Sequence, residues 1–348
     1  FDLTKEQSEF YDEIINKYFA DPDEGGLFKG AIYHPFEYEI EKEKTKGDSL
    51  EQSENFELMS QRNLYNFMRR LLVKRFESSF GAFEQSIKNF REVTKHVKEF
   101  IQKTDKYILD RDLLEKIYTE EPEEIELSLK DYAEKIKNGV RPKNSKIYDL
   151  SKFKYRDEFL NDIDSDEKLF DEILNLLNKL NLVDDKNDAK AKSLVNHSKN
   201  QLEKEPQRKI IIFSEYLDTV KYLKNILDKE FPGEVLTITD VLSKSIIDEI
   251  NRNFDASYPK EKQEDKYKIL LASDRISEGF NLNRAGMVIN YDIPWNPVRV
   301  IQRVGRINRI SKKVFDELYI VNFFPTEKGA EIVKSREIAS NKMFLIHN

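Results

Sequence analysis

The chain contains no cysteine, which excludes disulfide bridges and zinc sites built on thiolates. It has four histidines, His34, His96, His197 and His347, and no two of them have the spacing of metal ligands. We therefore expect no metal site made by this chain alone. It also has no run of eighteen apolar residues, so we expect no membrane-spanning segment.

A secretory leader pattern is missing as well, since the chain opens Phe1-Asp2-Leu3-Thr4 without an initiator methionine. This start predicts an excised piece of a longer protein and a cytoplasmic location. Of its 348 residues, 39% are hydrophobic and 35% are charged, and the net charge is -7. The length indicates two domains, or one domain with a large insertion. The acidic balance disfavours a broad nucleic-acid surface but leaves room for a basic cleft.

The first two-thirds of the chain has mainly the apolar spacing of helices. Thr4, followed by polar and acidic residues, predicts a helix start. A long helical pattern then runs from Leu58 through Phe100. Residues 103–166 are the most densely charge-patterned stretch.

The spacing of apolar residues changes near Arg208, where short apolar runs begin to alternate with helical patterns. Such alternation is typical of an α/β fold with a parallel sheet flanked by helices. Because ligands of these sheets gather at the carboxyl ends of the strands, the polar residues after each run are the candidate site residues. The runs expected to be strands are 210–213, 235–239, 268–272, 287–291 and 318–323.

The densest group of candidates follows the fourth run and reads Gln302-Arg303-Val304-Gly305-Arg306-Ile307-Asn308-Arg309. On a helix, Gln302, Arg306 and Arg309 lie on one face, because side chains three or four positions apart are neighbours. Two converging guanidiniums suit a phosphate group that gains charge in a transition state. The alternative is a solvated basic helix paired with acidic neighbours, and spacing alone does not separate the two.

Hydroxyl side chains follow two other strands. Ser214 comes after the first run and either contacts a nucleic-acid phosphate or caps the next helix. Ser273 opens segment 273–282, whose glycine, hydroxyls and amides suit phosphate contacts, although a helix cap is the simpler interpretation. Trp295, the single tryptophan, lies between prolines, and we expect it to pack rather than to stack on a base.

Taken in order, three of these segments resemble motifs of the second RecA-like lobe of superfamily-two helicases. Residues 210–216 resemble the fourth motif of that family, residues 271–282 the fifth, and residues 302–309 the sixth, which has the form Q-x-x-G-R-x-x-R. Residues 290–297, Asn-Tyr-Asp-Ile-Pro-Trp-Asn-Pro, are similar to the bacterial Swi/Snf-type branch that includes RapA/HepA-like proteins. Residues 3–11 and 72–79 also resemble segments of that branch.

The resemblance implies a domain organisation and a role for each matching residue. Arg306 and Arg309 match arginines that reach the γ-phosphate of ATP and stabilise charge in the transition state, as arginine fingers. Gln302 matches a residue that links the nucleotide to contacts between the lobes. The other implied roles are coupling of nucleotide state to strand contact (Glu278, Gly279), a place near the ATP ribose (Asn281) and contacts near the nucleic-acid backbone (Ser214, Ser273). The expected domains are a helical region leading into the second lobe (1–102), a helical insertion (103–165), the RecA-like C-terminal lobe (166–335) and a tail (336–348).

Two family features are missing from the sequence. No segment fits the phosphate-binding pattern G-x-x-x-x-G-K-[ST], and no recognisable Asp-Glu box for Mg²⁺ follows a strand. In the family both belong to a first lobe, which we expect to be absent here and to hold ATP and Mg²⁺. The resemblance thus implies the C-terminal half of an ATP-dependent DNA translocase or helicase that acts on double-stranded DNA and is inactive by itself. Two alternatives stay open: a non-catalytic lobe that docks nucleic acid or protein, and an RNA-directed helicase of the same superfamily.

Overall fold

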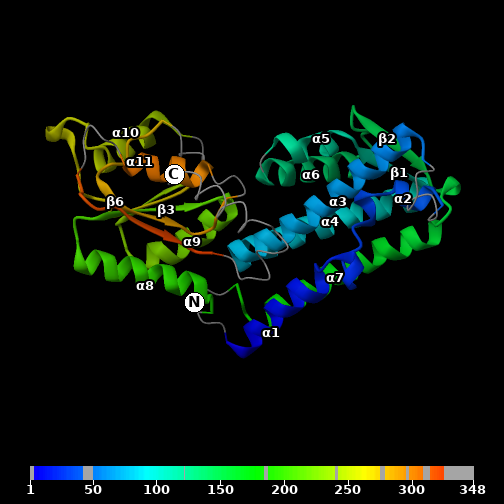
Figure 1. Ribbon diagram of the computed structural model, residues 1–348, viewed down its shortest axis with the longest axis horizontal. Helices are drawn as coiled ribbons and strands as arrows, with labels where there is room; N and C mark the ends of the chain where they lie inside the picture. Colours follow the sequence, from blue (N-terminus) through cyan, green and yellow to red (C-terminus); the bar gives the residue numbers. More distant parts are fainter. Residues whose placement is uncertain are drawn as a thin grey trace. The chain divides into compact units, whose positions relative to one another are not determined.

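The computed structural model describes residues 4–41, 50–120, 122–183, 187–239, 242–274, 279–294, 298–308 and 314–324. The chain divides into two compact units, each described by itself (Figure 1). The sheet unit contains Phe1–Leu3, Phe76–Ala82 and Asn181–Asn348, and the helical unit contains Thr4–Arg75 and Phe83–Leu180. After the helical residues 4–75, the chain therefore passes through the sheet unit at residues 76–82 and returns to it at residue 181.

Long amphipathic helices form most of the helical unit, as the spacing of apolar residues predicts. The hydroxyl of Thr4 accepts the Gln7 N–H, and the Gln7 side chain accepts the Thr4 N–H, which confirms the predicted helix start as a capping box. The helices are α1 (Lys5–Glu13), α2 (Phe36–Glu39), α3 (Gln52–Ser78), α4 (Phe80–Thr104), α5 (Asp112–Thr119), α6 (Pro122–Lys137) and α7 (Arg156–Lys179).

The stretch 103–165 is not wholly helical, in contrast to the helical insertion that the resemblance implies. It contains strands β1 (Lys106–Asp110) and β2 (Ser145–Asp149), which pair antiparallel. The reason lies in Tyr107-Ile108-Leu109, a buried apolar run with aromatic and β-branched side chains that favours a strand over a helix. The expected boundary at residue 166 also differs from the structure, because α7 runs across it without a break.

The sheet unit contains the predicted parallel sheet. Its strands lie in the order β4-β5-β3-β6-β7, and each neighbouring pair is parallel. Each observed strand overlaps one of the five predicted apolar runs. The elements are α8 (Ala189–Lys204), β3 (Lys209–Ser214), α9 (Leu217–Glu230), β4 (Val235–Ile238), α10 (Lys244–Phe254), β5 (Ile269–Ser273), β6 (Ala285–Asn290), α11 (Val298–Ile307) and β7 (Tyr319–Asn322).

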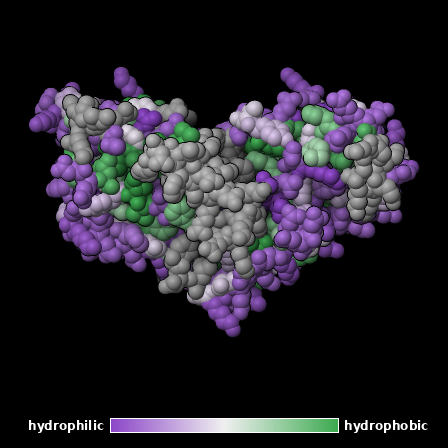
Figure 2. All heavy atoms as spheres, viewed as in Figure 1, coloured by the Kyte–Doolittle hydropathy of each residue, from purple (hydrophilic) through white to green (hydrophobic). Residues whose placement is uncertain are grey.

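Helices cover both faces of this sheet, α8 and α9 below it and α10 and α11 above it in Figure 1. The central strand β3 shows why, because its side chains alternate between two apolar clusters. Ile210 and Ile212 pack in the cluster that includes α8 and α9, while Ile211 and Phe213 pack in the cluster of α10 and Ile307. Hydrophilic residues, purple in Figure 2, make up most of the coloured surface on the face drawn. With both faces covered, the edge formed by the strand ends is the part of the sheet open to ligands.

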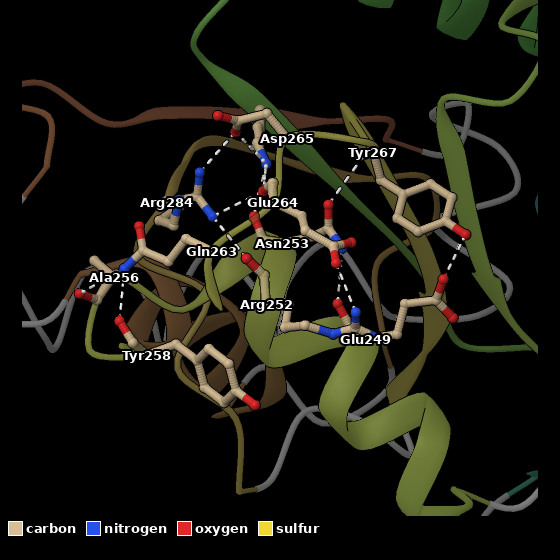
Figure 3. Close-up of polar contacts among 11 residues, drawn as sticks. Glu249, Arg252, Asn253, Ala256, Tyr258, Gln263, Glu264, Asp265, Tyr267 and Arg284 are labelled. Carbon is tan, nitrogen blue, oxygen red and sulfur yellow. Dashed lines mark hydrogen bonds and ion pairs between the residues drawn. The ribbon is translucent and has the colours of Figure 1, made fainter. Parts of the chain in front are cut away.

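At the amino ends of the strands, a group of ion pairs fastens the loop that leads from α10 to β5 (Figure 3). Lys209 Nζ donates to the Asn253 carbonyl at 2.7 Å and lies 2.9 Å from an Asp265 carboxylate oxygen. Arg284 also contacts Asp265, at 2.6 Å, and donates to the Arg252 carbonyl at 2.8 Å. Burial lowers the pKa of Lys209 to about 8, with Asp265 raising it and Arg284 lowering it.

This buried amine predicts a pH-dependent stability. Between about pH 8 and the ordinary lysine pKa of 10.5, the unfolded chain binds more protons than the folded chain, so stability rises with pH. Relative to Lys209→Met, the wild-type chain should gain on the order of 1 kcal/mol in unfolding free energy from about pH 7.5 to about pH 9.5. Urea denaturation of both proteins measures this gain. The matched control Lys262→Met, at an exposed position of the same loop, should lack it.

Candidate functional site

The carboxyl ends of the central strands bring together the polar residues of the candidate site. In the parallel register, Ser214 of β3 lies beside Ser273 of β5, and Phe213 lies beside Asn290 of β6. Asp274 directly follows β5, and α11 follows the loop after β6. The predicted gathering of these segments at one edge of the sheet is therefore present in the structure.

Arg303 fixes α11 against this edge. Its Nε and Nη2 donate to the two carboxylate oxygens of Asp274 at 2.6 and 2.8 Å, which is a bidentate ion pair. Its Nη1 donates to the Asn290 side chain at 2.9 Å and to the Asp292 carbonyl at 3.2 Å. The Arg303 side chain is 0% exposed, and its guanidinium lies over the Phe213 ring at 5.3 Å. The ion pair therefore holds α11 in one position.

Sequence reasoning treated Arg303 only as one of three clustered arginines and missed this structural role. The signal was present in the spacing, because Val300, Arg303 and Ile307 lie three and four positions apart and so share a face. All three are buried. Asp274, which directly follows the apolar strand β5, is the matching carboxylate that this reasoning also passed over.

Gln302 and Arg306 lie one helical turn apart on α11 and are half-buried. The Arg306 carbonyl accepts the Leu282 N–H at 3.0 Å, which ties the helix to the segment after β5. Asn281 in that segment is half-buried, and Gly279 is exposed with a φ of 89°, a conformation that favours glycine. The predicted residues Glu278 and Arg309, and Trp295, lie outside the described residues.

Both candidate hydroxyls are buried. Ser214 is 0% exposed, and its Oγ donates to the Asp292 carboxylate at 2.6 Å. The same carboxylate accepts the Glu215 N–H at 2.6 Å. Ser273 is also buried, at 4% exposed. The Ser214 hydroxyl thus serves the connection between β3 and β6, and the contact of Ser214 or Ser273 with nucleic acid stays a prediction.

Asp292 has a third donor that comes from far away in the sequence. Ser78, at the end of α3, donates its hydroxyl to the Asp292 carboxylate at 2.7 Å and lies 2.8 Å from the Thr219 hydroxyl. Lys190 Nζ donates to the carbonyls of Glu77 and Ser78 at 2.7 and 2.9 Å. A cation is favourable there because the last carbonyls of a helix carry partial negative charge. Burial lowers the pKa of Lys190, while nearby Asp292 and other carboxylates raise it.

The described part of the chain contains neither a candidate metal site nor a candidate membrane span. Among these residues, no group of three or more histidine, aspartate or glutamate side chains is arranged to hold a metal ion. Within the same ranges, no helix has both the length and the apolar character needed to cross a bilayer.

Comparison with known proteins finds similarity to helicases within the sheet unit. Residues 189–311 match the profile of the helicase conserved C-terminal domain. The uncharacterized ATP-dependent helicase YqhH of Bacillus subtilis is 33% identical over 105 residues, which are 30% of this chain and 17% of that protein. The SNF2 domain-containing protein CLASSY 3 of Arabidopsis thaliana is 31% identical over 140 residues, 38% of this chain and 9% of that protein. The ATP-dependent RNA helicase eIF4A of Candida glabrata is 30% identical over 87 residues, 25% of this chain and 22% of that protein.

The chain thus matches less than a quarter of the length of each of these relatives. Their alignments fall on a chain whose parallel sheet, helical α11 and gathered strand ends are those expected of a RecA-like lobe. The profile match covers β3 through α11, which includes all three sequence segments that resemble helicase motifs. Residues 189–311 of the chain therefore form a helicase conserved C-terminal domain.

Proposed function

We propose that the sheet unit is the C-terminal lobe of an ATP-dependent DNA translocase, in which Arg306 and Arg309 act as arginine fingers on ATP held by another lobe. The observation that carries this proposal is the Arg303–Asp274 ion pair. It fixes α11 at the carboxyl edge of the sheet and sets Gln302 and Arg306 on a part of the helix that is only half-buried. A guanidinium held in place beforehand stabilises developing charge without a cost of reorganisation.

The nucleotide would meet residues from two neighbouring segments. Arg306 and Arg309 would contact the γ-phosphate, and Gln302 would link the nucleotide to the partner lobe. Asn281 would lie near the ribose, and Glu278 and Gly279 would couple nucleotide state to strand contact. The Leu282–Arg306 main-chain hydrogen bond, at 3.0 Å, supports this grouping because it joins the two segments. Mg²⁺ would be held by the first lobe, whose phosphate-binding pattern this sequence lacks.

For the substrate, we propose double-stranded DNA and a protein of the bacterial Swi/Snf-type branch, in the cytoplasm. Support comes from the segment 290–297 and from the SNF2 domain in the name of the Arabidopsis relative. Closure of the two lobes on ATP would change the grip on the nucleic-acid backbone and so produce stepwise motion. The RNA helicase among the relatives favours the second candidate, an RNA-directed enzyme.

A nucleic-acid-stimulated ATPase assay on the complete protein that carries this chain tests the proposal. Double-stranded DNA should raise ATP turnover several-fold, and stimulation should fall as salt rises because backbone contacts are electrostatic. RNA duplex and single-stranded RNA of equal length are the matched controls, and equal or stronger stimulation by RNA supports the second candidate instead. The chain by itself should not turn over ATP. A complete protein without any ATPase activity would leave only a docking role for this lobe.

A further inference from the structure

The corner between α3 and α4 belongs to the sheet unit, although the rest of both helices belongs to the helical unit. It consists of Phe76–Ala82, and it lies outside the segment that matches the helicase domain, residues 189–311. Neither the motif resemblance nor the family profile gives this corner a role in ATP hydrolysis. The corner does contact the carboxyl edge of the sheet.

The corner reaches the edge through a serine that is completely buried. Ser78 is 0% exposed, and its hydroxyl lies within hydrogen-bonding distance of both Asp292 and Thr219. Lys190 holds the main chain of the corner by its two carbonyl contacts, and its ammonium group lies 4.2 Å from the centre of the Tyr291 ring. Ser78 is therefore held from both sides, and its position is set by the fold of the sheet unit.

Asp292 links Ser78 to α11. Its carboxylate accepts three hydrogen bonds, from Ser78, Ser214 and the Glu215 N–H, at 2.6 to 2.7 Å. Its own main-chain carbonyl accepts one of the hydrogen bonds of Arg303. The hydrogen bonds to the Asp292 carboxylate thus fix Asp292, and the main-chain carbonyl of Asp292 in turn accepts a hydrogen bond from Arg303 of α11. A buried carboxylate that loses one of its donors shifts or takes up water, because an unsatisfied charge is costly.

We propose that Ser78 is a positioning residue for ATP hydrolysis, acting through Asp292 and Arg303 on the placement of Arg306. This inference rests on the proposed function of Arg306. Displacement of a reacting group by as little as about 1 Å reduces rates strongly, so a small shift of α11 is enough to matter. A substitution of Ser78 should affect the chemical step of ATP hydrolysis. In this proposal Ser78 acts on Arg306 only through other residues and does not contact ATP.

The test compares two neighbouring buried serines in the complete protein. Ser78→Ala should lower the kcat of nucleic-acid-stimulated ATP hydrolysis by about tenfold while the KM for ATP changes little. Ser79→Ala is the matched control: the Ser79 hydroxyl accepts the Ala82 N–H and lies 3.2 Å from Thr219, but no contact joins it to Asp292 in the described structure. It should lose similar thermal stability and keep its kcat.

A double-mutant cycle identifies the path of the effect. If Ser78 acts through the carboxylate of Asp292, then Ser78→Ala combined with Asp292→Asn should lower kcat no further than Asp292→Asn alone. Equal kcat losses in Ser78→Ala and Ser79→Ala, or additive losses in the double variant, would overturn the inference. Arg306→Ala separates this failure from a failure of the proposed function. If Arg306→Ala abolishes turnover while Ser78→Ala leaves kcat unchanged, the positioning role alone is wrong.

Discussion

Arg306→Ala in the complete protein should lower ATP turnover by about 10³-fold or more, in the range measured for loss of an arginine finger. The reason is that Arg306 lies on a helix fixed by a buried ion pair, so the main chain that carries its guanidinium is already in place for a contact with the γ-phosphate. Turnover is measured at saturating ATP and nucleic acid. The affinity for nucleic acid, measured by fluorescence anisotropy at constant salt, should change by only a few-fold.

Arg306→Lys is the matched variant for this result. It keeps the positive charge but replaces a planar fork of donors by a single ammonium group. If the guanidinium acts on the transition state, the lysine variant should recover little of the lost turnover. Wild-type turnover in Arg306→Ala would refute the finger assignment, since no other described residue of α11 has been given that role. Arg309→Ala should behave like Arg306→Ala.

Arg303→Ala should instead destabilise the fold. Removal of Arg303 takes the bidentate partner from buried Asp274 and leaves that carboxylate only its contact with Arg299 at 3.3 Å, at a cost of about 3 kcal/mol. Two further acceptors, the side chain of Asn290 and the carbonyl of Asp292, lose their donor as well. Urea denaturation of the 348-residue chain measures the loss, and Arg306→Ala, three positions along the same helix, is the control that should change stability by less than about 1 kcal/mol.

The double variant Arg303→Ala/Asp274→Ala refines this prediction. Because it removes both charges, it should be more stable than the sum of the two single losses predicts, by a coupling of about 1–3 kcal/mol. Strictly additive losses, or a stable Arg303→Ala protein, would contradict the anchoring role. Arg303 and Arg306, which lie within one helical turn, could then no longer be assigned different functions.

The strands of the sheet could be predicted from the sequence because β-branched runs such as Ile210-Ile211-Ile212 carry their own signal. The strand order β4-β5-β3-β6-β7 could not be read from any single run. The gathering of candidate residues at one edge could be predicted too, since parallel strands bring their carboxyl ends together. The resemblance implied a helical insertion at 103–165 and gave no sign of the strand pair there, which the short apolar run at Tyr107 forms with its antiparallel partner around Tyr148.

The separate roles of Arg303 and Arg306 were harder to predict, because a guanidinium suits a carboxylate as well as a phosphate. Only the burial of Arg303 between Val300 and Ile307 separates its role from that of Arg306. The contact between Ser78 and Asp292 had no local signal at all. The two residues are 214 positions apart, and neither stands in a pattern that points to the other.

Binding of a transition-state analogue tests the central claim most directly. The complete protein and its Arg306→Ala variant would be titrated with ADP–aluminium fluoride and, separately, with a non-hydrolysable ATP analogue, both with Mg²⁺ and double-stranded DNA present. If Arg306 stabilises the transition state, the variant should lose about 100-fold or more in affinity for ADP–aluminium fluoride while its affinity for the ATP analogue stays within a few-fold. Equal affinity of both proteins for ADP–aluminium fluoride would contradict the account.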